Sequence, residues 1–136
     1  MERPKVYLDA NVFLYVFLGT GENHGLAKSL LSLVEQGKFE AHTCALTYDE
    51  VFWKVKQMRS FEDALKAAKL WLSLPNLNIL SVTAQTVWKA NDLQSKYGTK
   101  PRDAIHAAAA IMQDIKVIIS DDPDFDKIKE LKRKKL

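Results

Sequence analysis

Residues 6–18 read VYLDANVFLYVFL, and this stretch decides the fold class. Three apolar residues of the β-strand type precede Asp9, and a run without Gly or Pro then continues to Leu18. The first part predicts a short buried strand, and the second, from Asn11 onward, predicts a helix that Gly19 ends. A strand that passes directly into a helix is typical of α/β domains, in which parallel strands alternate with helices.

The same alternation continues over the rest of the chain. Further strands are predicted at 39–45, 77–82 and 116–120, and helices at 24–36, 47–58, 61–74, 83–97, 102–110 and 126–132. We therefore predict one α/β domain over residues 1–136, with a mainly parallel sheet of about four or five strands flanked by helices. The basic tail, residues 132–136, is predicted to be a solvated helix end, with a phosphate-contacting tail as the alternative.

The composition excludes several classes of protein. Of the 136 residues, 47% are hydrophobic, and 20 Lys and Arg against 17 Asp and Glu give a net charge of +3. This balance argues against intrinsic disorder, and the charge is too small to indicate nucleic acid binding by itself. No uncharged apolar run approaches the roughly 20 residues of a membrane span, and the single Cys44 cannot form an internal disulfide. We therefore expect a cytoplasmic protein without a membrane partner.

Carboxylates follow the predicted strands at four places in the chain. They are Asp9 after the first strand, Glu50 in the helix after the second, Asp103 in the first turn of the helix at 102–110, and Asp121 with Asp122 after the fourth strand. Because ligands bind at the carboxyl ends of parallel strands, we expect these side chains to converge at one edge of the sheet. Clustered carboxylates repel unless a cation lies among them, and oxygen ligands in this number suit Mg²⁺ or Mn²⁺ rather than zinc.

Most of these carboxylates also have a purely structural interpretation. Thr47 and Glu50 have the spacing of a helix capping box, Asp103 suits the positive end of a helix dipole, and residues 121–126 can form a turn and a cap. Asp9 has no such local role in the predicted structure. It is therefore the strongest single indication of a functional site.

Other residues are predicted to serve packing rather than chemistry. His106 lies on an apolar helix and is interpreted as a packed helix residue. Trp53, Trp71 and Trp88 lie at helical spacing with other apolar groups, so they are expected in the core or in an interface. The sequence contains no Gly-rich phosphate loop and no Gly-x-Ser-x-Gly motif.

Four segments, in order, resemble the PIN-domain ribonucleases, and most closely the VapC-type toxins of prokaryotic toxin–antitoxin pairs. They are VYLDANVFL at 6–14, ALTYDE at 45–50, PRDAIHAA at 101–108 and IISDDPDF at 118–125. The resemblance spans nearly the whole chain. It implies a metal-dependent endonuclease that hydrolyses RNA phosphodiester bonds.

The resemblance also implies roles for individual residues. Asp9, Glu50 and Asp103 match the first three acids of the family's site, and Asn11 matches a polar position that helps to hold the first of them. We expect Asp9 and Asp103 to hold a divalent ion, Mg²⁺ or Mn²⁺, with Glu50 and the fourth acid completing the site.

The fourth acid has two candidates. The family usually has Thr, a variable residue and then Asp before a Phe, which aligns Ser120 with the Thr and favours Asp122, with Asp121 as the alternative. Two basic residues, Lys100 and Arg102, flank the third acid and are expected to contact RNA phosphates, so that binding should weaken with salt.

The resemblance implies partners as well as a substrate. Family members commonly form homodimers, and the toxins are held inactive by a small antitoxin. The predicted helix at 11–18 is apolar on more than one face, so it is expected to be deeply buried or to belong to a homodimer surface or an antitoxin groove.

Other functions stay open at this point. They are a PIN-like RNA-processing nuclease that is not a toxin, a Mg²⁺-dependent phosphoaspartyl phosphatase or receiver-like domain, and a non-catalytic RNA- or protein-binding module. The phosphatase pattern needs an acid where this chain has Asn11, which counts against it.

Overall fold

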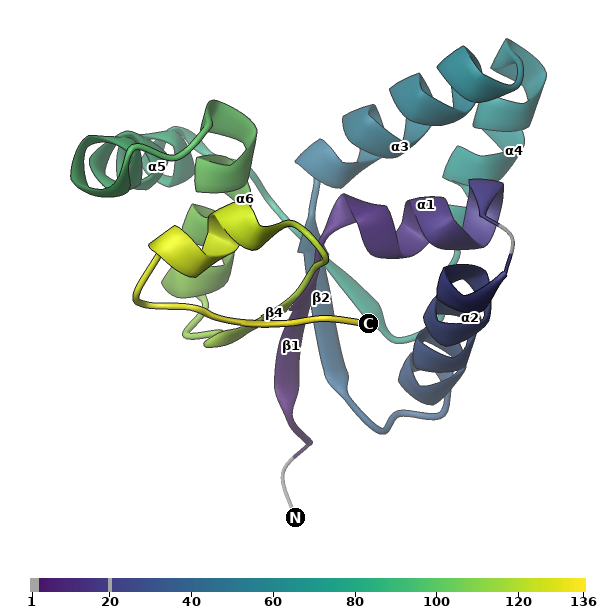
Figure 1. The fold of residues 1–136 in the computed structure, drawn as a ribbon, viewed down its shortest axis with the longest axis horizontal. Coiled ribbons are helices and arrows are strands. Elements are labelled where there is room, and N and C mark those ends of the chain that lie inside the picture. Colours follow the sequence, from purple (N-terminus) through teal and green to yellow (C-terminus); the bar gives the residue numbers. More distant parts are fainter. Residues whose placement is uncertain (1–2, 20) are drawn as a thin grey trace.

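Five parallel strands form one sheet in the computed structural model, which describes residues 3–19 and 21–136. The strands are β1 (Lys5–Leu8), β2 (Glu40–Cys44), β3 (Leu77–Leu80), β4 (Val117–Ile119) and β5 (Lys132–Lys134). Their order across the sheet is β3-β2-β1-β4-β5, and every neighbouring pair is parallel. From the central β1 the chain builds the sheet outward first on one side and later on the other (Figure 1). The predicted α/β fold is confirmed.

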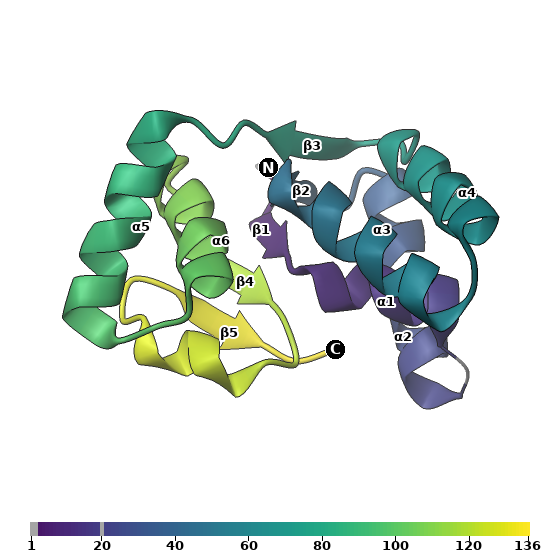
Figure 2. The ribbon, with the colours of Figure 1, turned by 90° about the horizontal axis from the view of Figure 1, so that it is seen from above.

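Helices cover both faces of the sheet. They are α1 (Ala10–Leu18), α2 (Glu22–Glu35), α3 (Leu46–Met58), α4 (Phe61–Leu72), α5 (Ala84–Tyr97) and α6 (Pro101–Met112), and a 3₁₀ helix, η1 (Pro123–Lys127), precedes β5. Seen from above, α1 to α4 lie on one side of the sheet and α5 and α6 on the other (Figure 2). This three-layer arrangement is what buries parallel strands on both faces.

The alternating side chains of β1 enter two separate cores. Val6 and Leu8 pack with the helices α1 to α4, in a cluster that includes Phe13 and Trp71. Tyr7 faces the other way and packs against the alanines of α6 and the apolar residues of α5. Because alanine has a small side chain, α6 lies close to the sheet, which places its first turn beside the end of β1.

Helix ends follow the local chemistry that the sequence indicates. The Ser60 hydroxyl accepts a hydrogen bond from the backbone N–H of Asp63 at 3.0 Å and caps α4. Thr83 and Thr86 form a reciprocal capping box at the start of α5, and Gly98 ends that helix at a positive φ of 67°. These predicted boundaries are confirmed.

One predicted element is wrong. Of the predicted helix at 126–132, only residues 126 and 127 are helical, as the end of the 3₁₀ helix η1, and the basic segment Lys132–Lys134 instead forms the edge strand β5 beside β4. Lys132 N–H donates to the Lys116 carbonyl at 2.8 Å, and Ser120 N–H donates to the Lys134 carbonyl at 3.0 Å. Backbone pairing with an open sheet edge outweighs the local helix preference of lysine. Lysine side chains on an edge strand also discourage pairing with a further strand.

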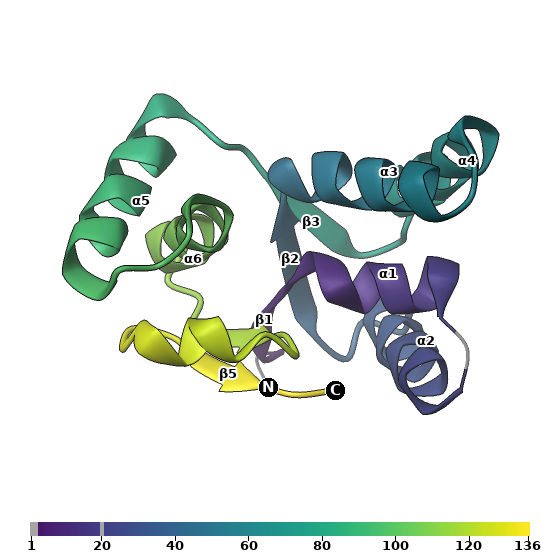
Figure 3. The same ribbon diagram turned by 45° about the horizontal axis from the view of Figure 1, so that its top comes forward.

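The apolar character of α1 is explained largely by packing within the chain. Val12 and Phe13 are fully buried, and Tyr15, Val16 and Phe17 are partly buried against the same core. The helix lies between α2 and α3 (Figure 3). Burial is therefore one of its two predicted roles, while a part in a homodimer surface or antitoxin groove stays a prediction.

The three tryptophans differ in position. Trp71 is in the core, whereas the side chains of Trp53 and Trp88 are exposed. Neither exposed ring contributes to the two cores, so a role in an interface, the predicted alternative, stays open for both.

None of the helices in the described part of the chain is long and apolar enough to cross a membrane.

Candidate metal centre

The candidate site lies at the carboxyl ends of the neighbouring strands β1 and β4. The chain adds β2 and β3 on one side of β1 and later adds β4 and β5 on the other, so the strand order switches direction between β1 and β4. In open parallel sheets this crevice is the usual place for a ligand. Asp9 directly follows β1, and its backbone N–H donates to the Ile119 carbonyl at 3.1 Å. Ser120 directly follows β4, and its hydroxyl donates to Asp9 Oδ2 at 2.7 Å. The two strand ends are thereby tied together at the site.

Asp9 also has a local structural role, so the prediction that it lacks one is wrong. It is the N-cap residue of α1, and its Oδ1 accepts a hydrogen bond from the Ala10 backbone N–H at 2.8 Å. Burial raises the pKa of the Asp9 carboxyl above its usual value, while His106, Ser120 and the Ala10 N–H partly offset that rise. One carboxylate therefore begins a helix and faces the candidate site at the same time.

The Ser120 hydroxyl is the centre of a small polar network. It accepts from Asn11 Nδ2 at 3.3 Å and from the Asp122 backbone N–H at 3.0 Å, in addition to donating to Asp9. Asn11 thus reaches Asp9 through Ser120. Its own Oδ1 is buried and has no hydrogen-bond partner among the described residues.

Three carboxylates face one another beside this network. One oxygen from each of Asp103, Asp122 and Asp124 lies within 4.8 Å of the others. Asp103 Oδ2 is buried and has no hydrogen-bond partner in the described part of the chain. Burial, together with the charges of Asp122 and Asp9, raises the pKa of Asp103 to about 6. A half-buried Asp103 oxygen that faces two further carboxylates belongs to a donor set that suits a hard divalent cation.

Of the two candidates for the fourth acid, Asp122 belongs to this group and Asp121 does not. Asp121 Oδ2 accepts from the Tyr15 hydroxyl at 2.9 Å, and its Oδ1 accepts from the Leu136 backbone N–H at 3.2 Å. Both oxygens of Asp121 are therefore engaged away from Asp103. Sequence reasoning left Asp124 out of the site, because it reads as a turn residue of η1.

Glu50 is also free of the structural role predicted as its alternative. The capping box at the start of α3 is absent, since the N-cap residue is Ala45 and no side chain caps the helix. The Thr47 hydroxyl instead pairs with the Thr43 hydroxyl at 2.7 Å. Glu50 Oε1 is hydrogen-bonded to His106 Nε2.

His106 lies fully buried between Glu50 and β1. Its Nδ1 is 2.6 Å from the Tyr7 hydroxyl and 3.6 Å from Cys44 Sγ, and its Nε2 is also 3.8 Å from Asp9 Oδ1. The prediction of a packed residue is confirmed. The contact with Glu50 was missed, because the two residues are 56 positions apart in the chain.

The neighbours of His106 change its acidity. Burial by itself lowers the pKa of the imidazole, but the contacts with Cys44 and Glu50 and the charge of Asp9 outweigh burial, so the pKa lies well above its usual value. One signal in the sequence points toward this position. His106 follows Asp103 by three residues, which places both on the same side of α6.

Basic side chains border the acids from outside. Lys100 Nζ lies 3.3 Å from Asp124 Oδ2, and Arg102 Nη2 lies 4.0 Å from Asp49 Oδ2. Both cationic side chains are largely exposed, with 76% and 64% of their surface accessible. They are therefore free to exchange these partners for another anion.

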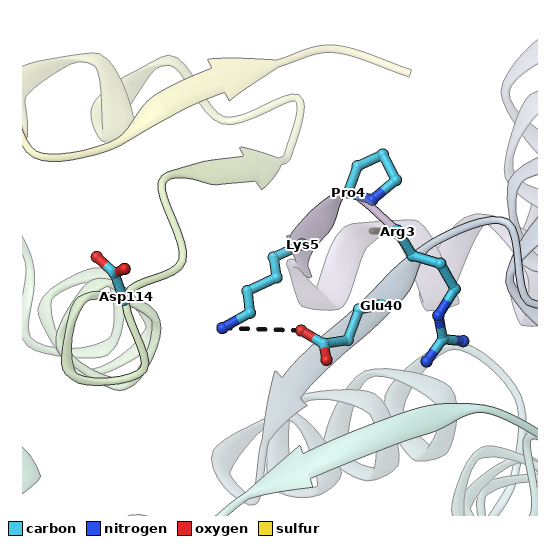
Figure 4. A pocket seen from close by; sticks show the side chains of 5 residues that line it. All are labelled: Arg3, Pro4, Lys5, Glu40 and Asp114. Atoms are coloured by element: carbon cyan, nitrogen blue, oxygen red, sulfur yellow. Dashed lines mark ion pairs between the residues drawn. The ribbon is translucent and has the colours of Figure 1, made fainter. Parts of the chain in front are cut away.

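A second polar region lies at the opposite edge of the sheet. Arg3, Pro4, Lys5, Glu40 and Asp114 line a hollow of about 640 Å³ at the amino ends of β1 and β2 (Figure 4). Its lining carries two cations and two carboxylates, and Lys5 Nζ lies 3.9 Å from Glu40 Oε2. Because this hollow balances its own charge, we place the chemistry at the acidic edge and not here.

Carboxylates gathered at the strand switch point of a parallel α/β domain are typical of a site that binds a divalent metal ion. Residues 6–131 match the sequence model of the PIN domain, and the chain belongs to the PIN domain family. Comparison with curated protein sequences gives no significant match.

Several solved structures share the fold. VapBC2 from Rickettsia felis, bound to a DNA fragment from its promoter, has a TM-score of 0.77 and 15% identity, covering 96% of this chain and 98% of that one. VapC20 from Mycobacterium tuberculosis, a toxin that cleaves the sarcin-ricin loop, has a TM-score of 0.76 and 19% identity over 91% and 95% of the two chains. VapBC-1 from nontypeable Haemophilus influenzae has a TM-score of 0.68 and 19% identity over 96% and 97%. At these identities the similarity shows a shared fold.

Proposed function

We propose that this protein is a divalent-metal-dependent endoribonuclease and the VapC-type toxin of a toxin–antitoxin pair. The observation that carries the proposal is the group of carboxylates at one sheet edge, in which oxygens of Asp103, Asp122 and Asp124 lie within 4.8 Å of one another and Asp103 Oδ2 is buried with no partner among the described residues. Membership of the PIN family and the toxins among the similar structures support the same conclusion.

The residues of the site divide the work among them. Asp9 and Asp103 hold the ion, Mg²⁺ or Mn²⁺, and Asp122 is the fourth acid. A divalent ion held there would supply a water of lowered pKa and a positive charge for the phosphodiester. The Ser120 hydroxyl holds Asp9 and the backbone of Asp122 in fixed positions relative to each other through its hydrogen bonds. Glu50 completes the acidic edge from α3.

The surroundings of the acids suit an RNA backbone. Lys100 and Arg102 are exposed at the rim, Lys100 as the N-cap residue of α6 and Arg102 in its first turn, next to Asp103. Helix N-termini and basic side chains both favour phosphate groups. We propose that these two residues hold the phosphates on either side of the cleaved bond, which makes RNA binding weaken with salt.

The proposal includes two protein partners. Similar structures from Rickettsia felis and Haemophilus influenzae are VapBC assemblies, and by analogy we propose that a small antitoxin inhibits this chain and that the chain forms a homodimer. An RNA-cleaving toxin acts where its RNA is, so we place the protein in the cytoplasm.

The test is RNA cleavage by purified protein with Mg²⁺ or Mn²⁺. The substitutions Asp9→Asn and Asp103→Asn keep the size of each side chain and should lower the cleavage rate by at least about 100-fold. Asp114→Asn is the matched control, because Asp114 lies at the opposite edge at a positive φ of 56° that asparagine tolerates. Undiminished cleavage by both site variants would refute the site, and cleavage that needs no divalent ion would refute the metal dependence.

A further inference from the structure

We propose that His106 is a positioning residue that holds the Glu50 carboxylate at the acidic edge, and that Tyr7 fixes the imidazole ring for this purpose. The inference rests on the proposed function, in which Glu50 completes the site. It assigns a role to a buried hydrogen-bond chain that joins β1, α6 and α3.

Both ring nitrogens of His106 have a partner. Nδ1 lies 2.6 Å from the Tyr7 hydroxyl, and Nε2 is hydrogen-bonded to Glu50 Oε1. His106 and Tyr7 have no exposed surface, while the Glu50 side chain is 19% exposed. The chain of contacts therefore runs from the buried centre of the sheet to a carboxylate that reaches the surface.

The partners determine which nitrogen donates. A carboxylate only accepts hydrogen bonds, so the contact with Glu50 requires a proton on Nε2 of His106. The Tyr7 hydroxyl can donate to an unprotonated Nδ1 or accept from a protonated one. The Tyr7 hydroxyl therefore forms a hydrogen bond with Nδ1 whether or not Nδ1 carries a proton. In both cases Nε2 can carry a proton and donate it in a hydrogen bond to Glu50.

This arrangement restrains a flexible side chain. A free glutamate samples many rotamers, and ordering it at the moment of reaction slows the chemical step. The ring of His106 is itself fully buried and makes an edge-to-face contact with the Tyr7 ring, with centroids 5.7 Å apart. A buried donor on a rigid helix thus sets the position of Glu50 before RNA binds, in the way that outer hydrogen bonds orient metal-site carboxylates.

Two amide substitutions separate this role from simple packing. In His106→Gln the amide nitrogen reaches about as far as Nε2 and can still donate to Glu50, whereas in His106→Asn it reaches only the position of Nδ1. We expect kcat for RNA cleavage to fall roughly 10- to 100-fold in His106→Asn and to stay within about 3-fold of the wild type in His106→Gln. KM should be unchanged in both variants.

An equal loss of kcat in the two variants would overturn the proposal, because a packing role makes no distinction between them. If His106→Asn fails to fold, Tyr7→Phe removes a single hydroxyl and leaves the ring of His106 in place. It should lower kcat by less than ten-fold at unchanged KM, and an unchanged kcat would count against the proposal.

A measurement without metal or RNA tests the contact itself. In the metal-free wild type, the imidazole N–H proton that faces Glu50 should give an NMR resonance protected from exchange with water. Glu50→Ala should shift this resonance and speed its exchange. Glu40→Ala is the matched control, because Glu40 lies 3.3 Å from the Nε2 of a different histidine, His42.

The two proposals fail in distinguishable ways. A wild type that cleaves no RNA with either metal would refute the nuclease function, and the NMR experiment would still decide whether His106 holds Glu50. A resonance that Glu50→Ala leaves unmoved would overturn the role of His106 even in an active nuclease.

Discussion

The two edges of the sheet carry similar charged residues in opposite arrangements. At the carboxyl edge, oxygens of Asp103, Asp122 and Asp124 lie within 4.8 Å of one another. At the amino edge, cations alternate with carboxylates, and the Lys5 ammonium lies 3.9 Å from Glu40. Three carboxylates lie together at the carboxyl edge, with Lys100 outside them as a partner of Asp124, whereas two cations and two carboxylates line the hollow at the amino edge.

The difference shows that the arrangement of charge indicates function better than its sum. The hollow at the amino edge is neutral by its own lining residues. At the carboxyl edge, burial and then the charges of Asp122 and Asp9 raise the pKa of Asp103, so its ionised form is destabilised there. Perturbed acids in a crevice are a recognised mark of a functional site, and a divalent ion would relieve the repulsion.

The largest expected effect distinguishes two acids of the same loop. Asp122→Asn should lower RNA cleavage by about 100-fold or more, because it removes a charge that faces Asp103. Asp121→Asn should leave cleavage within about 3-fold of the wild type, because its oxygens are engaged with Tyr15 and Leu136. Cleavage rates of the two purified variants decide this, and a greater loss in Asp121→Asn would reverse the assignment of the fourth acid.

Addition of metal should stabilise the protein through the carboxyl edge alone. At a Mn²⁺ concentration of 100 times its dissociation constant, the free energy of unfolding should rise by about 2.7 kcal/mol. Thermal unfolding with and without the ion measures this. Asp103→Asn should lose most of the gain, and Glu40→Gln, at the other edge, should keep all of it. A gain that persists in Asp103→Asn would place the ion elsewhere.

The smallest effect is a dependence of stability on pH in the metal-free protein. The pKa of Asp103 is raised from 3.8 to about 6, so the folded chain binds more protons than the unfolded one and ionisation destabilises it. The penalty is absent below about pH 4, grows from there, and is complete above about pH 6.

Asp103→Asn removes this penalty. At pH 7 the free energy of unfolding of this variant should exceed that of the wild type by about 1 kcal/mol, because solvent screens the charge of a half-buried side chain and keeps the penalty small. Urea unfolding at pH 4 and pH 7, with a chelator present, measures the difference. Asp114→Asn should show no such dependence, and an equal gain in Asp103→Asn at both pH values would contradict the prediction.

Much of this architecture could be predicted from local sequence. The apolar runs predicted four of the five strands, and the rule that ligands lie at strand ends predicted that Asp9, Glu50, Asp103 and either Asp121 or Asp122 would converge at one edge. The structure brings oxygens of Asp103 and Asp122 within 4.8 Å of each other, together with Asp124. The fifth strand could not be predicted, because residues 132–134 form it through backbone bonds to β4 and have no strand preference of their own. The position of Asp124 depended in the same way on the turn at η1.

Two side chains of α3 form hydrogen bonds that their local sequence spacing does not predict. The spacing of Thr47 and Glu50 fits a capping box. In the structure, however, the Thr47 hydroxyl is hydrogen-bonded to Thr43 and the Glu50 carboxylate to His106. Each of these partners lies on a different element from the helix that carries the spacing. A local pattern therefore predicts which bonds are possible, and packing selects among them.

The sequence by itself determined the alternation of strands and helices and the edge at which the acids gather, because periodicity and the handedness of parallel connections depend on the chain alone. Only the tertiary structure decided which acid of the pair Asp121 and Asp122 faces Asp103, and that His106 holds Glu50. These outcomes depend on the directions of side chains from separate elements, which are set when the two cores close around β1.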